Sequence, residues 1–493
     1  MFNAKDILNQ PPQSLQRWKS AIFSNYQVDE NDYLEQLFPL AESSPDDLEY
    51  ITDHTITLIN KVRAKGGERD TVESFLHQYS LDTEEGVVLM CLAEALLRIP
   101  DANSANSLIK DKLASADWRS YIGKSDSWLV NASAWGLVLT GKFVTLDKDF
   151  SRESSNILSK TVAKTGEPVI RAALNQVMKF MGRQFVLGRS IEEALKRGKA
   201  SWKKGYTHSF DMLGEAAFTA DDAEKYFIAY KDAINTLGEQ KKPKDLLAPS
   251  ISIKLSALHP RYDVSKHDRV LKELGHKLAE LAQTAKAVDV AISIDAEEAD
   301  RLEISLELFE NLYRSDVCKD WSGLGLVVQA YSKRALPVLG WVNQLATELD
   351  RRIPVRLVKG AYWDSEIKWS QQRGLKSYPV FTRKAASDIS YLSCARYLFS
   401  LVDHIYPQFA THNAQTIANI LSIAKDNRDF EFQRLHGMGE ALYDEVLKEQ
   451  QQAETPISCR IYAPVGLYNE LLPYLVRRLL ENGANSSFVH QLV

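Results

Sequence analysis

The chain has 493 residues, 45% of them hydrophobic and 25% charged, and its 60 basic and 65 acidic residues give a net charge of -5. This length favours two to four domains with enough apolar residues for a large core, and the composition is that of an ordinary globular protein. The slightly acidic balance excludes a general electrostatic attraction to nucleic acid. The four cysteines show no metal-binding or disulfide spacing, so we expect no metal site and a reducing, cytoplasmic location.

The first 60 residues (1–60) predict an N-terminal arm with helical pieces. They begin without the basic and apolar regions of a signal peptide. Within residues 1–50, three basic residues stand against nine acidic ones. We therefore expect no basic strand that enters a DNA groove, and no DNA binding.

Residues 61–186 follow a helical pattern and predict an all-α domain. A capping box that begins at Asp82 precedes the apolar run Val87–Ile99. This run and Trp128–Leu139 are the most apolar stretches of the chain. Both are too short to cross a bilayer, so we interpret them as buried core helices.

Residues 187–493 contain eight short apolar runs that alternate with longer amphipathic stretches such as Asp268–Lys286. The eight runs are His208–Leu213, Ile251–Leu255, Val290–Asp295, Leu324–Ala330, Val355–Val358, Gln408–His412, Phe430–Leu435 and Ser458–Ala463. Alternating β and α units predict a parallel sheet. Eight such units predict a (β/α)8 barrel of the TIM type, in the α/β class.

Most of the predicted strands end in a polar or charged residue, at Asp211, Lys254, Asp295, Gln329, Lys359, His412, His436 and Tyr462. The carboxyl ends of barrel strands carry the active site, but strands also end at polar loops that have no function. Asp295 is therefore either a carboxylate paired with a cation or tyrosine inside the barrel, or a residue that organises substrate-binding arginines.

Basic residues gather near the same strand ends, at Lys254, Arg356, Lys359 and the pair Arg383-Lys384. Such a set suits a phosphate-bearing cofactor or an anionic substrate, and ordinary surface salt bridges are the alternative. No P-loop and no clean dinucleotide fingerprint occurs in the sequence. We interpret Gly437-Met438-Gly439 as a tight turn, so a flavin or nicotinamide is not expected to be held in the doubly wound manner.

The last predicted helix, within residues 469–485, has two stripes at helical spacing. The apolar stripe consists of Leu472, Leu475, Val476, Leu479 and Leu480, and the second stripe of Tyr474, Arg477, Arg478 and Glu481. One interpretation is a surface helix with a solvated polar face. The other is a helix over the barrel mouth, whose paired arginines bind a carboxylate in a bidentate manner.

Five long segments carry a resemblance to a known family: SIKLSALHPRY, SIDAEEADRLEISLELFE, RLVKGAYWDSEIK, FATHNAQTIANI and CRIYAPVGLYNELLPYLVRRLLENGANSSFV. They closely resemble the proline dehydrogenase domain of bifunctional proline utilization A, from about residue 50 to the end. The resemblance implies a barrel with noncovalent FAD that oxidises L-proline to pyrroline-5-carboxylate by hydride transfer to flavin N5. It also implies a quinone as electron acceptor, reached by peripheral association with the inner membrane.

The resemblance assigns the site residues. The substrate carboxylate would be held by Lys254, Arg477 and Arg478, with support from Asp295 and Tyr462. The pyrrolidine ring would be enclosed by Tyr362, Leu435 and Tyr474, and Glu215 would pair with Arg477 in a gate. Arg356 would lie near flavin N5. The remaining flavin site would consist of Gln329, Lys359, Gly360, Ala361, Trp363, Thr382, Arg383, Lys384, Thr411, His412, Asn413, Gln433 and Glu481.

The sequence departs from this family in two respects. Many relatives begin with a ribbon-helix-helix DNA-binding domain, which we expect to be missing here. They also continue into an aldehyde dehydrogenase domain, whereas this chain ends at Val493, so we expect a truncated chain, with a natural single-activity protein as the alternative. The alternatives are another flavin barrel of the methylenetetrahydrofolate reductase kind, a DNA-binding regulator without catalysis, and a degenerate barrel. The arginine pair disfavours a folate site, the acidic arm disfavours a regulator, and the intact motifs disfavour a degenerate barrel.

Overall fold

The computed structural model describes residues 2–12, 14–64, 185–240, 247–450 and 456–466. The chain divides into two compact units, Met1–Val62 with Leu187–Val465, and Arg63–Val186 with Gly466–Val493. Nearly all of the second unit lies outside the described residues. The all-α domain expected at 61–186 and the last helix with Tyr474, Arg477, Arg478 and Glu481 therefore stay predictions.

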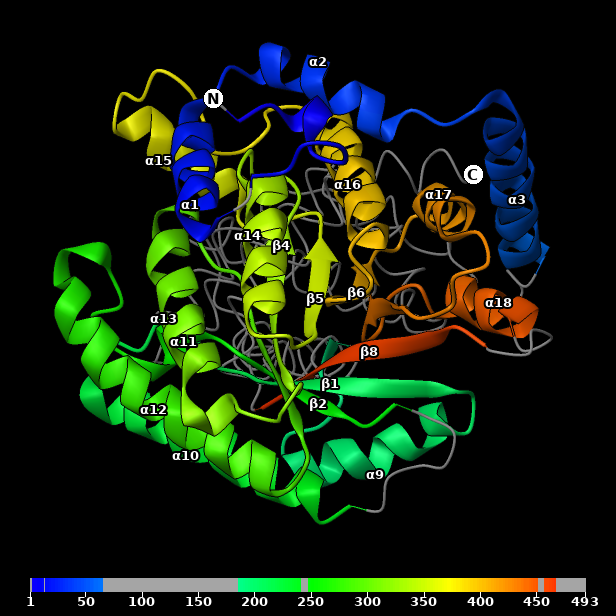
Figure 1. The fold of residues 1–493 in the computed structure, drawn as a ribbon. Coiled ribbons are helices and arrows are strands. Elements are labelled where there is room, and N and C mark those ends of the chain that lie inside the picture. The colour runs from blue at the N-terminus through cyan, green and yellow to red at the C-terminus, as the bar shows by residue number, and fades with distance from the viewer. Residues whose placement is uncertain (1, 13, 65–184, 241–246, 451–455, 467–493) are drawn as a thin grey trace, which may run out of the picture. The chain divides into compact units, whose positions relative to one another are not determined.

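Eight parallel strands form a closed barrel in the order in which they occur along the chain, as the sequence predicts (Figure 1). The strands are β1 (Tyr206–Met212), β2 (Ser250–Ile253), β3 (Ala291–Ile294), β4 (Leu324–Gln329), β5 (Ile353–Val358), β6 (Ile405–Ala410), β7 (Glu431–Leu435) and β8 (Ser458–Val465). Closure occurs between β1 and β8, where Ser209 is in register with Tyr462. Every predicted run overlaps one of these strands, with ends displaced by up to three residues.

Helices follow the strands and cover the outside of the barrel. They are α9 (Ile191–Trp202), before β1, then α10 (Ala220–Gly238), α11 (Leu255–Leu258), α12 (His267–Ala287), α13 (Leu302–Arg314), α14 (Ala335–Glu348), α15 (Trp363–Gln372), α16 (Lys384–Phe399), α17 (Ala414–Ala424) and α18 (Glu440–Gln450), with 3-10 turns η5 (Val264–Lys266), η6 (Ala299–Arg301) and η7 (Asp316–Cys318). α10 begins at a capping box, in which the Thr219 hydroxyl accepts from Asp222 N at 3.1 Å and the Asp222 carboxylate accepts from Thr219 N at 3.0 Å.

The N-terminal segment consists of η1 (Ala4–Asp6), α1 (Leu15–Ser24), η2 (Asn25–Gln27), α2 (Glu30–Ala41) and α3 (Pro45–Ala64). α1 packs on α14 and α2 packs on α16 (Figure 1). The Trp18 ring lies so close to Gly340 of α14 that a Cβ there would come within 2.2 Å of it. Arg396 of α16 donates to the Leu40 carbonyl at 2.8 Å. These contacts attach the arm to the barrel.

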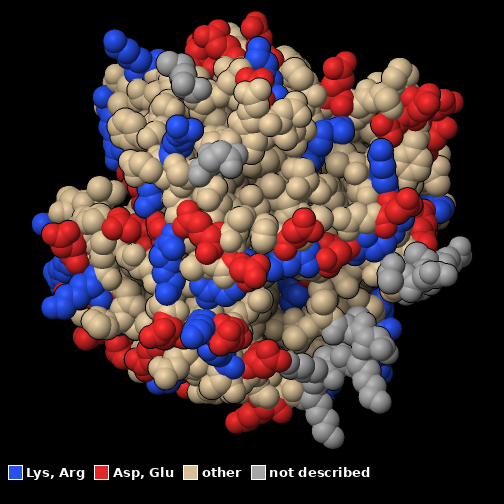
Figure 2. Space-filling model, in the orientation of Figure 1, with Lys and Arg blue, Asp and Glu red and all other residues tan. Residues whose placement is uncertain are grey.

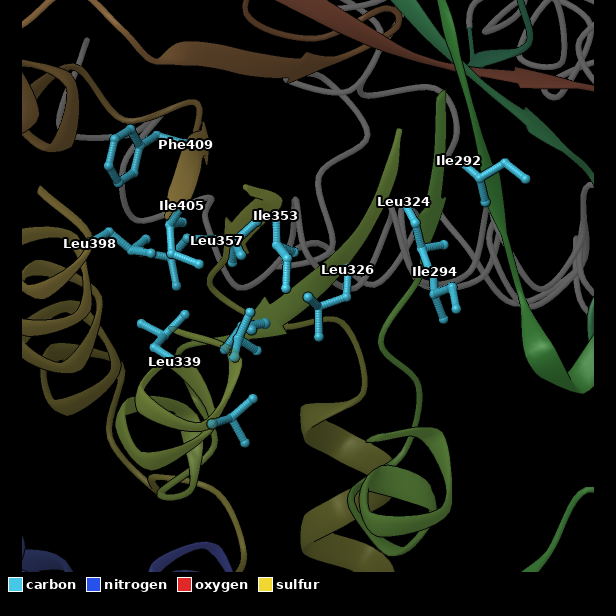
Figure 3. Close-up of a cluster of buried hydrophobic side chains, with 14 of the residues drawn as sticks. Ile292, Ile294, Leu324, Leu326, Leu339, Ile353, Leu357, Leu398, Ile405 and Phe409 are labelled. Carbon is cyan, nitrogen blue, oxygen red and sulfur yellow. The ribbon is translucent and has the colours of Figure 1, made fainter. Parts of the chain in front are cut away.

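Strand residues alternate between two environments. Leu324, Leu326, Ile353 and Leu357 point outward into the layer beneath the helices, where they meet residues such as Leu339 (Figure 3). Residues between them point into the barrel, because successive side chains of a strand lie on opposite faces. This alternation turns polar residues such as Arg356 inward and so builds the site.

Candidate active site

The candidate site lies inside the barrel, at and near the carboxyl ends of the strands. Asp211 is the penultimate residue of β1, Lys254 and Asp295 directly follow β2 and β3, Arg356 lies in β5 and Tyr462 in β8. Asp211 is fully buried, and Lys254 and Arg356 are 7% and 3% exposed. Charged groups this well buried require partners, and each of these groups has one.

Lys254 is the cation at the centre of this group. Its ammonium lies 2.6 Å from Asp211 Oδ1, 3.4 Å from Asp295 Oδ2, and 3.2 Å from the Tyr462 hydroxyl, to which it donates. The Tyr462 hydroxyl donates in turn to Asp295 Oδ2 at 2.8 Å. The ammonium thus donates to Asp211 and Tyr462 and forms an ion pair with Asp295.

Arg356 extends the network across the barrel. Its Nη1 donates to Asp295 Oδ1 at 3.0 Å, and its Nη2 donates to the hydroxyls of Ser209 and Ser252 at 3.1 and 3.0 Å. The guanidinium carbon lies 5.1 Å from the centroid of the Tyr462 ring. Asp295 is therefore paired with a cation and with a tyrosine, one of the two alternatives that the sequence leaves open. Its part in organising substrate arginines stays a proposal.

The electrostatics of the network follow from burial and from opposite charges. Burial raises the pKa of Asp211, while the Lys254 ammonium opposes that shift. Burial alone would lower the pKa of Lys254, but Asp211, Tyr462 and Asp295 together raise it well above its ordinary value. Burial also raises the pKa of the Tyr462 hydroxyl. The network thus contains two basic side chains, two carboxyl groups and a phenol, and its formal charges balance when all four ionisable partners other than the phenol are charged.

Three inward-facing residues of this network have no role in the sequence-based assignment. They are Asp211, Ser209 and Ser252, although Asp211 does appear there as a strand end. Ser209 and Asp211 alternate with the buried aromatic side chains His208 and Phe210 in β1. This two-residue period was the available signal, since it places the small and charged residues on the inner face.

The loops after β4 and β5 bring together three residues of the expected flavin site. The Gln329 side chain donates to the Glu297 carbonyl at 2.9 Å and accepts from Ala361 N at 3.1 Å. Gly360 has φ +148, and a Cβ there would come within 2.4 Å of the Tyr331 ring. Only glycine fits this position without strain.

Other expected flavin residues contact protein groups. Lys359 donates to Asp388, and the Trp363 indole donates to the Phe381 carbonyl at 2.8 Å. Thr382 and Arg383 donate to Glu30 of the arm, and Lys384 is the first residue of α16. These groups lie around the segment that connects α15 to α16.

The next expected residues belong to the neighbouring units of the barrel, with Thr411 to Asn413 directly after β6 and Gln433 within β7. His412 Nε2 accepts from Leu435 N at 2.9 Å, which leaves the ring proton on Nδ1. Thr411 is 5% exposed, and Asn413 caps α17 by accepting from Thr416 N at 2.9 Å. Gln433 donates to Glu431 at 2.6 Å, while its buried Oε1 accepts no hydrogen bond from any described residue.

The three other expected residues within the described ranges lie at or between element ends. Leu435 is the last residue of β7 and is in register with Tyr462, and Tyr362 directly precedes α15. Glu215 follows β1, in the segment before α10. Whether these three enclose or gate a substrate stays a prediction.

A cavity of about 50 Å³ adjoins Asp295, between the loop after β3 and helices α13 and α14. Its polar lining includes Glu297, Glu298, Arg301 and Arg334. Burial raises the pKa of Glu297 to about 7. Across the described ranges, no cluster of His, Cys, Asp and Glu is arranged to hold a metal, and no helix is both long and apolar enough to span a membrane.

Comparison with known proteins matches this chain to two family profiles. The profile described as "Proline dehydrogenase" matches residues 194–491, and the one described as "DNA-binding domain of Proline dehydrogenase" matches residues 71–185. The bifunctional protein PutA of Klebsiella aerogenes is 47% identical over 488 residues, which cover 98% of this chain and 37% of that protein. Proline dehydrogenase 1 of Bacillus subtilis strain 168 is 29% identical over 62% of this chain and 88% of its own.

The fold also matches solved structures. A mutant of proline utilization A from Bradyrhizobium japonicum superposes with a TM-score of 0.70 at 46% identity, over 95% of this chain and 46% of that one. This chain thus spans less than half the length of these bifunctional relatives.

Proposed function

Because the chain belongs to the proline dehydrogenase family, we propose that it oxidises L-proline to pyrroline-5-carboxylate with noncovalent FAD. The observation that carries this proposal is the buried network of Lys254, Asp211, Asp295, Arg356 and Tyr462 at the carboxyl ends of the strands. A TIM-type barrel places its chemistry at that end. A water-poor set of fixed charges there suits a small zwitterionic substrate.

The described residues fit a flavin. A buried Arg356 Nε and a buried Gln433 Oε1 have no partner among the described residues, so both are available to a bound group. Gly360 keeps side-chain atoms away from the backbone beside Gln329 and Ala361. We propose that Gln329, Arg356, Lys359 to Ala361, Trp363, Thr382 to Lys384, Thr411 to Asn413, Gln433 and Glu481 hold FAD. When bound, FAD supplies the acceptor for the hydride that leaves the substrate.

The protein's own part in the reaction is to bind, orient and desolvate. We propose that Lys254, Arg477 and Arg478 bind the proline carboxylate, and that Asp295 and Tyr462 fix Lys254. Tyr362, Leu435 and Tyr474 would enclose the pyrrolidine ring and limit its rotation. A substrate held in one orientation reacts with a smaller entropic barrier.

A closing gate completes the proposal for the site. Glu215 and Arg477 would pair across the mouth and exclude water while the substrate is bound. The electron acceptor we propose is a membrane quinone, reached by peripheral association from the cytoplasm.

The sequence analysis and one of the two matched family profiles lead to opposite expectations about DNA binding. The profile that matches residues 71–185 is described by its DNA-binding role, and those residues lie outside the described ranges. On the face shown in Figure 2, acidic and basic side chains are interspersed. We keep the prediction that this chain does not bind DNA. A gel shift with a proline-operon promoter tests it, and a salt-sensitive complex at low protein concentration would contradict it.

The visible spectrum of the purified protein tests the main proposal. After reconstitution with FAD, we expect a flavin spectrum that bleaches when L-proline is added without oxygen, and acid should release the flavin. Glycine serves as the control, because it has a carboxylate and an amine but no pyrrolidine ring. A protein that stays colourless after FAD addition, or a flavin that L-proline leaves oxidised, would count against the proposal.

A further inference from the structure

The N-terminal arm contacts two residues of the proposed flavin site directly. Glu30, the first residue of α2, accepts from Thr382 N at 2.8 Å, from the Thr382 hydroxyl at 2.9 Å and from Arg383 Nε at 3.3 Å. The neighbouring Asn31 side chain accepts from Arg383 Nη2 at 2.8 Å. Two adjacent arm residues therefore bind two adjacent residues more than 350 positions later in the sequence.

A second contact lies one helical turn away. Tyr33 stacks on Phe381, with ring centroids 6.1 Å apart and planes 7° apart. Both rings are buried, at 2% and 0% exposure. Residues three apart on a helix share a face, so Glu30 and Tyr33 present one surface to the three consecutive residues Phe381 to Arg383.

The loop after β4 completes the support of this segment. Lys333 Nζ donates to the Val28 carbonyl of the arm at 2.9 Å and to the Ser377 hydroxyl at 3.1 Å. Phe381 N donates to the Tyr331 carbonyl at 2.8 Å. Residues 377–383 are thus fixed on one side by the barrel and on the other by the arm.

We propose that Glu30 is a positioning residue for FAD, acting through Thr382 and Arg383. The Glu30 side chain is 12% exposed and that of Arg383 is 61% exposed, so the proposal depends mainly on the two bonds to Thr382. This inference rests on the proposed function, because it takes Thr382 and Arg383 as cofactor residues. It makes the arm a part of the cofactor site that the barrel residues alone do not supply.

The direction of the change in FAD affinity distinguishes two roles of Glu30: positioning the cofactor residues, or competing with the cofactor for them. If Glu30 positions Thr382 and Arg383, its removal weakens FAD binding. If its carboxylate instead competes with the cofactor phosphates for the same donors, its removal strengthens FAD binding, because two like charges no longer repel.

The test is titration of the flavin-free, full-length protein with FAD, followed by flavin fluorescence. We expect Glu30→Ala to bind FAD roughly tenfold more weakly, since charge-assisted hydrogen bonds are lost. We expect Glu30→Gln, which keeps the size and one acceptor, to fall between Glu30→Ala and the wild type. The matched control is Glu310→Gln, which breaks another ion pair of the arm, with Lys19 at 2.8 Å, and should leave FAD affinity unchanged.

Hydrogen exchange of residues 377–384 in the FAD-bound protein gives a second readout. Exchange should be faster in both Glu30 variants and unchanged in Glu310→Gln, since Glu30 bonds directly to this segment whereas Glu310 pairs with Lys19 and Arg314. If the wild type binds FAD and both Glu30 variants bind it as tightly, or more tightly, the inference is wrong while the proposed function stands. If the wild type does not bind FAD at all, both fail.

Discussion

The contact between Lys254 and Asp211 gives the sharpest prediction about the network, tested by Lys254→Met. The two charged atoms are 2.6 Å apart, and the side chains are 8% and 0% exposed. Asp295 would keep Arg356 and Tyr462 as partners after the substitution, but Asp211 would lose the one charged partner within hydrogen-bonding distance in the described structure. Removing one member of a buried ion pair costs about 3–5 kcal/mol, because the remaining charge is left uncompensated.

Replacing the carboxylate of this pair should cost less stability than replacing the ammonium. In Asp211→Asn, Lys254 keeps Tyr462 at 3.2 Å and Asp295 at 3.4 Å, so we expect a cost of about 1–3 kcal/mol. The double variant leaves no unpaired charge at either position. Its cost should therefore be smaller than the sum of the single costs by at least about 1 kcal/mol.

The loss in Lys254→Met should also depend on pH. Burial raises the pKa of Asp211, and without the ammonium nothing comparable opposes that shift. A carboxyl group whose folded pKa exceeds its unfolded value opposes folding more strongly as pH rises from the unfolded towards the folded pKa. The cost of Lys254→Met should thus be larger at about pH 8 than at about pH 5.

Urea unfolding of the four proteins at both pH values measures these quantities. The matched control is Lys231→Met, which breaks a pair with the same 2.6 Å separation but with side chains 40% and 50% exposed. That exposed pair should contribute less than about 1 kcal/mol. The double-mutant cycle of Lys254→Met and Asp211→Asn decides the point. If its stability losses are additive, or if Lys254→Met loses as little stability as Lys231→Met, the two residues are not a coupled buried pair.

Three further predictions concern turnover. Arg356→Met should lower the midpoint potential of bound flavin and slow its reduction, with each ~30 mV corresponding to about 1.4 kcal/mol. An unchanged potential at full flavin occupancy would show that Arg356 does not lie near the flavin. Arg478→Met and Arg477→Met should each lower kcat/KM for L-proline by roughly tenfold or more while FAD stays bound, because about 2–5 kcal/mol of binding free energy is lost. Normal kinetics in both variants would support a solvated helix instead. Glu215→Ala should raise KM for L-proline with little change in Tm, and its effect should be non-additive with that of Arg477→Met; strictly additive losses in kcat/KM would show that the two residues do not form a gate.

The barrel was predictable because each unit carries a local signal. The run Leu324–Ala330 is apolar and short, and the stretch Asp268–Lys286 has helical spacing, and the structure has β4 and α12 at these places. The exact ends of the strands were less predictable. Asp295, counted as a strand end, directly follows β3, although its backbone N still donates to the Ile253 carbonyl. A hydrophobic pattern does not fix the last residue of a strand to within one or two positions.

The arm contacts had no local signal. In the sequence, Glu30 is indistinguishable from any acidic residue in the first turn of a helix, where negative charge is stabilised by the helix dipole. Its contact with Thr382 depends on how α2 packs on α16, which no short pattern encodes. Asp211 is the intermediate case, since the period of β1 shows that it points inward but not that Lys254 meets it there.

The charge of the network limits how a substrate carboxylate can bind. Two basic and two acidic side chains balance in formal charge, and the Lys254 ammonium already lies within 3.4 Å of Asp211, Asp295 and Tyr462. An added carboxylate makes this desolvated region negative unless further cations approach it. Of the three partners, the Tyr462 hydroxyl is the least costly for Lys254 to release, because it is uncharged whereas the other two are carboxyl groups. We therefore expect the proline carboxylate to replace the Tyr462 hydroxyl at Lys254, so that Tyr462 fixes Lys254 before the substrate binds and Asp295 continues to do so afterwards. The carboxylate would need Arg477 and Arg478 for the remaining charge. On this argument Lys254 cannot compensate for the loss of either arginine, so all three cations are required together.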